Sequence, residues 1–110
     1  HIGDDVTVGP NAVLHACTID DNVLVGMGAI IMDGAHIKSD SVVAAGALVP
    51  QGKEFPSKSL IVGVPARIAR SLTEEEIRSF KQKNEYYIEN KNELLNNMSP
   101  DALASEDDGV

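Results

Sequence analysis

A six-residue spacing of apolar residues constrains this chain more than any other feature of its sequence. The spacing is kept along the first half of the chain except for one five-residue step between Leu14 and Ile19. An amphipathic helix repeats its apolar positions about every 3.6 residues and a half-buried strand about every two, so the spacing fits neither. The anchors of the repeat are Ile2, Val8, Leu14, Ile19, Val25, Ile31, Ile37, Val43, Val49, Phe55 and Ile61.

The fourth residue after each anchor is small or β-branched, with Lys53 as the exception: Val6, Ala12, Thr18, Val23, Ala29, Ala35, Ser41, Ala47 and Ser59. A triangular coil with one hexapeptide per side explains this pattern, because the anchor then points inward and the small residue fits at a corner. Stacked coils bury a continuous column and pair their backbones. We therefore predict a mainly β fold, a parallel β-helix of about three coils over residues 1–70. The alternative, short strands in a sandwich, does not explain so regular a spacing.

A C-terminal helix is predicted over residues 71–98. The repeat stops before Pro65, which suits an exit from the stack. Thr73 and Glu76 have the spacing of a capping box, with Leu72 and Ile77 as its hydrophobic staple. We expect the helix to end near Asn96-Asn97 and to pack along the coil of its own or a neighbouring subunit, and residues 99–110 to form an acidic, flexible tail. The apolar stripe of the helix, which Asn84 interrupts, is Ile77, Phe80, Tyr87, Ile88 and Leu95.

Composition excludes several classes of protein. The net charge of −8 argues against nucleic acid and anionic membranes as partners. A single Cys cannot form an internal disulfide, and no apolar run approaches the ~20 residues that span a bilayer. The chain begins in mid-pattern on His1-Ile2-Gly3, so we expect an N-terminal part to be missing. Nothing indicates secretion, which favours the mitochondrial matrix or the cytoplasm.

The segments VTVGPNAVLHACTI, VLVGMGAIIMDGA, AAGALVPQGK, GVPAR and LTEEE together resemble the γ-class carbonic anhydrase family. This family includes bacterial carbonic-anhydrase-like hexapeptide proteins and the γ-carbonic-anhydrase subunits of mitochondrial respiratory complex I. The resemblance covers the chain from His1 to about residue 95. It implies a left-handed β-helix and a trimer that binds zinc, or sometimes iron or cobalt, at subunit interfaces. It also implies hydration of carbon dioxide by a metal-bound hydroxide (carbonate dehydratase activity).

The resemblance implies an incomplete metal site in this chain. In the family three His bind the metal, two from one subunit and one from its neighbour. Two of them lie five residues apart in a pattern like VGHxxxLHGC. His15 matches the second of these, whereas Pro10 stands at the first and cannot ligate a metal. The third His lies upstream of the first residue of this sequence, as do the Arg, Asp and Gln that the family uses around the metal.

His15 has three open interpretations. It is one ligand of a site that an upstream His and a partner subunit complete, or a relic that packs or hydrogen-bonds at the interface, or it serves an unrelated purpose.

Tyr87 aligns with a helix Tyr that approaches the metal in some family members, and its alternative role is packing in the apolar stripe. We expect His36, with Asp33 and Asp40 nearby, to lie on the surface. Cys17 is expected to be a small core residue.

Three functional hypotheses follow. The first is a γ-carbonic-anhydrase-like subunit without autonomous activity that acts as a structural or assembly component, for example in the matrix arm of complex I. The second is a zinc-dependent carbonic anhydrase whose site is completed across a subunit interface. The third is a hexapeptide acyltransferase with His15 as general base. Because a short stack leaves an open edge, we also predict a homo- or heterotrimer of related subunits, with no membrane span and no nucleic acid or DNA.

Overall fold

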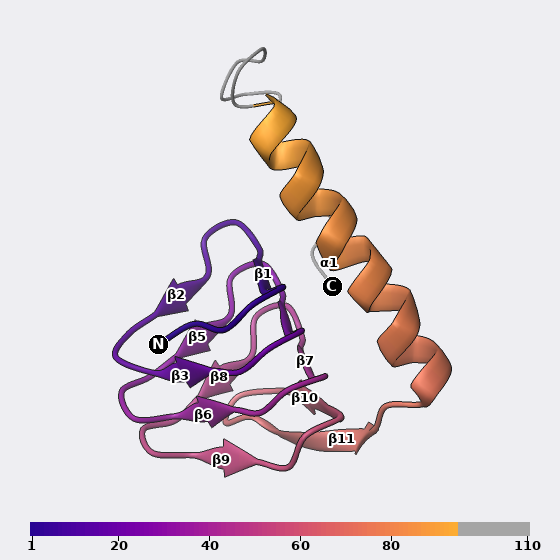
Figure 1. Cartoon of the computed structure of the whole chain (residues 1–110). Helices are drawn as coiled ribbons and strands as arrows, with labels where there is room; N and C mark the ends of the chain where they lie inside the picture. Colours follow the sequence, from indigo (N-terminus) through magenta and orange to yellow (C-terminus); the bar gives the residue numbers. More distant parts are fainter. Residues whose placement is uncertain (95–110) are drawn as a thin grey trace.

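The chain forms a three-sided stack of coils with one helix beside it (Figure 1). The structure is a computed structural model that describes the backbone of residues 1–94 and the side chains of residues 1–84. The first side carries β1 (Thr7–Val8), β4 (Leu24–Val25), β7 (Val42–Val43), β10 (Ser59–Val62) and β11 (Arg67–Ser71). The second carries β2 (Val13–Leu14), β5 (Ile30–Ile31) and β8 (Leu48–Val49), and the third β3 (Thr18–Ile19), β6 (His36–Ile37) and β9 (Glu54–Phe55).

Neighbouring coils pair in parallel on all three sides, as the six-residue spacing predicts. The register places each anchor under the anchor of the coil above, for example Val8 over Val25 and Val25 over Val43. The solenoid of about three coils is therefore confirmed. The anchors form its core: Ile19, Val25, Ile31, Ile37, Val43, Val49 and Ile61 are all at most 1% exposed.

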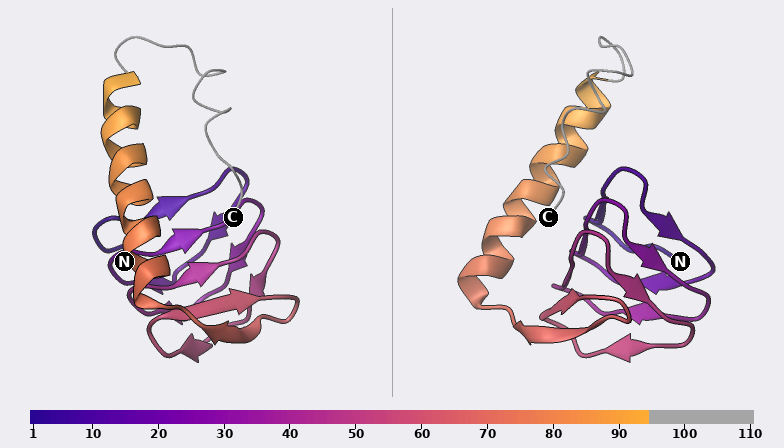
Figure 2. Two further views of the ribbon diagram at one scale, coloured as in Figure 1. Left: turned by 90° about the vertical axis from the view of Figure 1, so that its right-hand side faces the viewer. Right: turned by 180° about the vertical axis from the view of Figure 1, so that it is seen from behind.

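The anchors of the first coil are less buried than those below. Ile2 is 51% exposed, while Val8 and Leu14 are half-buried and pack against the core from one side. Among the described residues no coil lies above them, so only their lower surfaces are covered. The first coil, drawn at the top of the stack in Figure 2, therefore leaves apolar side chains partly exposed.

The five-residue step changes one corner of the first coil. The sequence pattern assigns the small inward position after Leu14 to Thr18, and this assignment is wrong: Cys17 is buried there at 7% exposure, whereas Thr18 is half-buried. The deletion falls before Cys17, so the inward position has to be counted back from the next anchor, Ile19. Val23 and Ala35 occupy the same place in their units.

The corners require backbone with positive φ. Three columns of such residues run down the stack: Asp5, Asn22, Asp40 and Lys58; Asn11, Gly28 and Gly46; and Ala16, Gly34 and Gly52. Glycine adopts this conformation freely, Asn and Asp adopt it at modest cost, and Ala is strained there. Ala16, with φ +49° and an exposed side chain, is therefore the least suitable residue of the third column.

The end of the stack contains a hairpin that the sequence pattern does not reveal. After Gly63 the chain turns back, and β11 pairs antiparallel with β10, so that Ile68 lies opposite Ile61. All five residues of β11 are exposed. The turn residues Gly63-Val64-Pro65 are the signal that sequence reasoning read only as an exit from the repeat.

Helix α1 (Glu74–Leu94) begins where the capping box predicts. The Thr73 amide donates to Glu76 Oε1 at 3.0 Å, and the Glu76 amide donates to Thr73 Oγ1 at 3.1 Å. Leu72 and Ile77 are both buried in one cluster with Phe80, as the staple requires. The expected helix end near residues 96–97 and the expected tail lie outside the described residues.

Polar contacts join α1 to the corner column of Asp5, Asn22, Asp40 and Lys58, both near the bottom and near the top of the stack. Near the lower end, Lys58 Nζ donates to Glu74 Oε1 at 2.9 Å. Higher up, Asn84 Nδ2 donates to the Asp5 carbonyl oxygen at 3.0 Å and to Asn22 Oδ1 at 3.3 Å. Asn84 is fully buried. The polar residue that interrupts the apolar stripe therefore hydrogen-bonds the helix to the upper two coils.

The three sides of the stack differ in what their outward residues are. On the helix face, Leu24, Val42 and Leu60 pack under α1. On the apolar face, the outward column of β2, β5 and β8 is Val13, Ile30 and Leu48. On the polar face, the outward column of β3, β6 and β9 is Thr18, His36 and Glu54.

Replacing Ala16 with glycine is expected to raise the free energy of unfolding by about 1 kcal/mol, because it removes the strain of a Cβ at positive φ without loss of packing. Equilibrium urea unfolding measures the change. Ala47→Gly is the matched control: Ala47 is buried and not among the residues with positive φ, so this change is expected to destabilise. A destabilised Ala16→Gly variant would contradict the assignment of strain.

Stability is expected to fall on acidification between about pH 4.5 and pH 2 as Glu76 takes up a proton. The hydrogen bonds from Arg70, and next the Thr73 amide, lower the pKa of Glu76 from about 4.5 to about 2. A folded-state pKa below the unfolded one stabilises at pH values above the unfolded value, and this contribution is lost as pH falls. Circular dichroism at 222 nm on thermal unfolding at several pH values measures the loss. Glu76→Gln is expected to flatten this part of the profile, and an unchanged slope in that variant would contradict the prediction.

Candidate functional site

His15 lies at the corner between β2 and β3 and forms an ion pair with Asp33 of the coil below. Its Nδ1 contacts Asp33 Oδ1, and the structure gives Nε2 no partner among the described residues. The side chains are 72% and 45% exposed, respectively. The one histidine that the sequence singles out is therefore on the surface, with one ring nitrogen engaged.

The five-residue step places Asp33 beneath His15. His15 registers with Met32, since their amides donate to the Ile31 and Val49 carbonyl oxygens, respectively. Cys17 registers with Ala35, because β3 pairs with β6. Between these pairs the upper coil has Ala16 alone where the lower coil has two residues, so Asp33 has no counterpart above it.

Asp33 is the site residue that sequence reasoning missed. It considered Asp33 only as a residue close to His36 in the sequence, whereas the structure pairs Asp33 with His15. The signal was available: a residue deleted from one coil leaves the residue of the next coil unopposed.

The donor set does not fit a complete zinc site. A protein zinc site takes about three or four Cys, His or carboxylate ligands. Among the residues with described side chains, no group of three His, Cys, Asp or Glu could hold a metal ion. Pro10 lies exposed at the other end of the β2 segment, at the corner where the resemblance places a second His. His15 alone could supply a nitrogen ligand, and no reaction step through a metal follows from these residues.

Tyr87 belongs to α1, but its side chain lies outside the described part of the chain. The expectation that Tyr87 approaches a metal therefore remains a prediction.

Cys17 is buried in the aliphatic core, as expected. Desolvation by burial raises the pKa of its thiol, and thiolate is the nucleophilic form. Cys17 is thus a packing residue.

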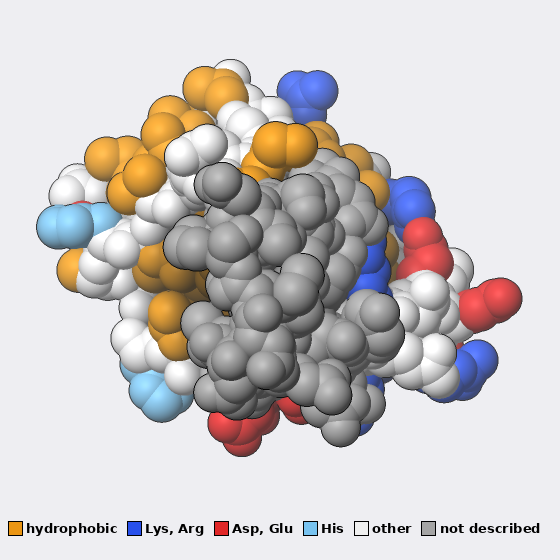
Figure 3. Space-filling view, turned by 90° about the horizontal axis from the view of Figure 1, so that it is seen from above, with side chains coloured by type: hydrophobic (Ala, Val, Ile, Leu, Met, Phe, Trp, Pro, Cys, Tyr) orange, Lys and Arg blue, Asp and Glu red, His pale blue; other side chains and the backbone are white. Residues whose placement is uncertain are grey.

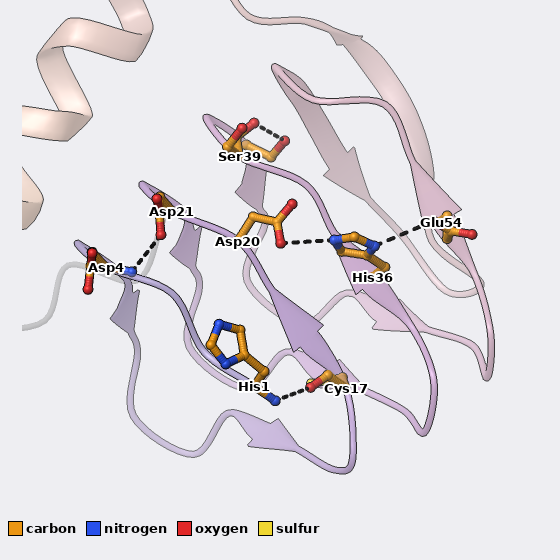
Figure 4. Close-up of polar contacts among 9 residues, drawn as sticks. His1, Asp4, Cys17, Asp20, Asp21, His36, Ser39 and Glu54 are labelled. Carbon is orange, nitrogen blue, oxygen red and sulfur yellow. Dashed lines mark hydrogen bonds and ion pairs between the residues drawn. The ribbon is translucent and has the colours of Figure 1, made fainter.

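His36 lies on the polar face between two carboxylates. Its Nε2 is 2.9 Å from Asp20 Oδ1 and its Nδ1 is 3.4 Å from Glu54 Oε1. Figure 4 shows the imidazole lying between Asp20 and Glu54 across stacked strands. His36 is half-buried on the surface, as expected, and its carboxylate partners are Asp20 and Glu54.

The apolar face carries large hydrophobic side chains in contact with solvent. Val13 is 50% and Ile30 is 40% exposed, and Met27 and Met32 flank Ile30 at 44% and 38%. Seen from above, hydrophobic side chains gather along one side of the molecule (Figure 3). Exposed apolar patches of this kind mark surfaces that contact other proteins. His15 and Pro10 lie at the two corners that bound this face.

A groove of about 520 Å³ runs between α1 and the helix face. Its floor is apolar and is formed by Leu24, Val42, Leu60, Leu72 and Phe80. Its rim carries Arg70, Glu75, Glu76 and Lys83, of which Arg70 and Glu76 are paired with each other. The groove contains none of the predicted site residues.

No helix within the described residues is both long enough and apolar enough to cross a membrane.

Comparisons with known proteins place these features in context. Residues 16–51 match the family model described as bacterial transferase hexapeptide (six repeats). The chain is 47% identical over 87 residues to mitochondrial gamma carbonic anhydrase 2 of Arabidopsis thaliana, covering 79% of this chain and 31% of the relative. It is 52% identical over 87 residues to a probable carbonic anhydrase of Methanocaldococcus jannaschii, covering 79% of this chain and 55% of the relative.

Among solved structures, the hexapeptide transferase family protein of Anaplasma phagocytophilum aligns with a TM-score of 0.73 at 33% identity, over 84% of this chain and 67% of that protein. The chain thus spans 31% and 55% of the lengths of these two curated relatives.

Proposed function

This chain belongs to the γ-carbonic-anhydrase-like hexapeptide-repeat family, and we propose that within this family it is a trimeric subunit without autonomous hydratase activity. Its role would be that of a structural or assembly component, as in the matrix arm of respiratory complex I. The observation that carries the proposal is Pro10, an exposed residue without a ligating group at the position that the family pattern gives to a metal-binding His.

The apolar face supports assembly. Val13, Ile30 and Met27 expose large apolar surfaces beside one another on a flat sheet, whereas the helix face is covered and the polar face carries ion pairs. Burying such a surface contributes about 25 cal/mol per Å². The face is bounded by Pro10 on one side and His15 on the other. In a closed three-fold arrangement, contacts are heterologous, so the His15 side of one subunit meets the Pro10 side of the next.

The proposed mitochondrial setting is supported by the names of relatives, whereas the link to complex I comes only from the family resemblance. The Arabidopsis proteins that match this chain are named as mitochondrial γ-carbonic anhydrases. A bacterial relative, protein YrdA of Escherichia coli, is 44% identical over 94 residues. A matrix location therefore suits a mitochondrial origin of this chain, and a cytoplasmic location suits a bacterial one.

The second candidate function is zinc-dependent hydration of carbon dioxide, with the metal ligands completed across the interface. The observation that favours it is His15, whose Nε2 has no partner among the described residues and faces away from Asp33. An acyltransferase is less well supported, because the basic residues Lys58 and Arg70 pair with Glu74 and Glu76 instead of forming an open anion site.

Ile30→Glu is expected to dissociate the trimer, because three carboxylates would be buried in apolar interfaces. Light scattering coupled to size-exclusion chromatography measures the mass, with a shift from trimer to monomer as the expected result. Ile68→Glu is the matched control, since Ile68 is equally exposed at 41% but lies on β11, outside the apolar face. A trimer that persists in Ile30→Glu, or a wild-type chain that is monomeric, would overturn the proposed interface.

Pro10→His is expected to create metal binding that the wild-type assembly lacks, because each interface would then hold two imidazoles. The measurements are cobalt titration by visible absorption and elemental mass spectrometry of the dialysed trimer. We expect at least a tenfold gain in affinity over wild type, and its loss in the double variant Pro10→His with His15→Ala.

Pro50→His is the control, because it makes the same exchange two coils lower on the His15 side, about 10 Å from His15. Stoichiometric metal in the wild-type assembly, lost on His15→Ala, would contradict the inactive role and support the second candidate.

A further inference from the structure

The contact between His15 and Asp33 has no evident role in stability. Both side chains are substantially exposed, at 72% and 45%. Exposed ion pairs contribute about 0–1 kcal/mol. Asp33 does not belong to the buried core. The positive φ that the corner needs is supplied by its neighbour Gly34, at +74°. The pair therefore calls for another explanation.

The backbone sets which nitrogen of His15 meets the carboxylate. Gly34 donates its amide to the Ala16 carbonyl oxygen at 2.8 Å, and His15 donates its amide to the Ile31 carbonyl oxygen at 3.0 Å. These bonds fix the two corners against each other on both sides of the pair. Since the upper coil has one residue fewer at this corner, the Asp33 carboxylate is unopposed and reaches Nδ1.

This contact selects one tautomer of the neutral ring. An ionised carboxylate only accepts hydrogen bonds, so a neutral imidazole beside it must carry its proton on the nitrogen that faces it. In His15 that nitrogen is Nδ1, and Nε2 keeps its lone pair. His36 differs, because carboxylates face both of its nitrogens. Of these two histidines, only His15 has a ring nitrogen that no described carboxylate faces.

We infer that Asp33 is a positioning residue that holds neutral His15 in the Nδ1–H tautomer and presents its Nε2 lone pair at the edge of the apolar face. The recipient is a hydrogen-bond donor of a neighbouring chain. Only the assignment of this edge to a subunit interface rests on the proposed function. The tautomer itself is a property of the single chain.

The test is nitrogen-15 NMR on the full chain labelled at histidine. The spectra are recorded along a pH series, and the neutral ring is read at the alkaline end, where the ring nitrogen shifts no longer change with pH. We expect Nδ1 of His15 to resonate as a pyrrole-type nitrogen and Nε2 as a pyridine-type nitrogen. In Asp33→Ala, which removes the acceptor, the Nε2–H tautomer should become the major form.

Asp20→Ala is the matched control, because Asp20 faces His36 in the corresponding ion pair of the polar face. It should change the His36 spectrum and leave that of His15 unchanged. A wild-type His15 in the Nε2–H tautomer, or a His15 spectrum that does not change in Asp33→Ala, would overturn the inference. Amide spectra of each variant show that the fold is kept.

A second measurement separates this inference from the proposed function. In the Pro10→His background, removal of Asp33 should weaken cobalt binding by about tenfold or more, as loss of a carboxylate behind a ligating histidine does. An unchanged cobalt affinity contradicts the positioning role. If Pro10→His binds no cobalt, the proposed interpretation of Pro10 fails, while the NMR result still decides the role of Asp33.

Discussion

The pairing of each coil with the next is the constraint on which the rest of this structure depends. Every side of the stack gives only two residues per coil to the ladder, so no single strand is stable alone, and the aliphatic column inside supplies the apolar burial. That column requires an anchor at a fixed position on every side. Once the anchors are fixed, the residue before each anchor must point outward. The chemistry of the three faces is thus determined by residues that the core does not use.

Much of this could be predicted from the sequence, because the relevant signals are local and periodic. The anchors, the coil count and the capping box of α1 all depend on residues within six positions of each other, and the structure forms them as expected. The β10–β11 hairpin could not be predicted in this way. It breaks the period, and its pairing of Ile61 with Ile68 depends on where the chain turns after the last coil. Asn84 shows the same limit, since its hydrogen-bond partners lie some sixty to eighty residues away in sequence.

In the candidate site, too, the residues marked by a local pattern could be predicted and the others could not. His15 was identified because a motif with fixed spacing marks it, and Pro10 because it departs from that motif. Asp33 was not identified, because its relation to His15 arises from a missing residue in another coil and not from any pattern around itself. The misplacement of Thr18 has the same origin. A one-residue deletion shifts the count of inward positions. Counting forward from the anchor Leu14 therefore gives Thr18, whereas counting back from Ile19 gives the buried Cys17.

The stack assigns each residue to a face by its position within the repeat and not by its distance along the chain. Residues that share a surface are therefore one coil apart in the sequence, which is seventeen positions for Val13 and Ile30 and eighteen for His36 and Glu54. Their immediate neighbours in the sequence face elsewhere. Each face of this molecule is thus built from one column of residues, with one residue from each coil. Substitutions within one column can change what that face binds without altering the other two faces. A chain can therefore lose the ligands of a binding site on one face and keep the contacts that its other faces make.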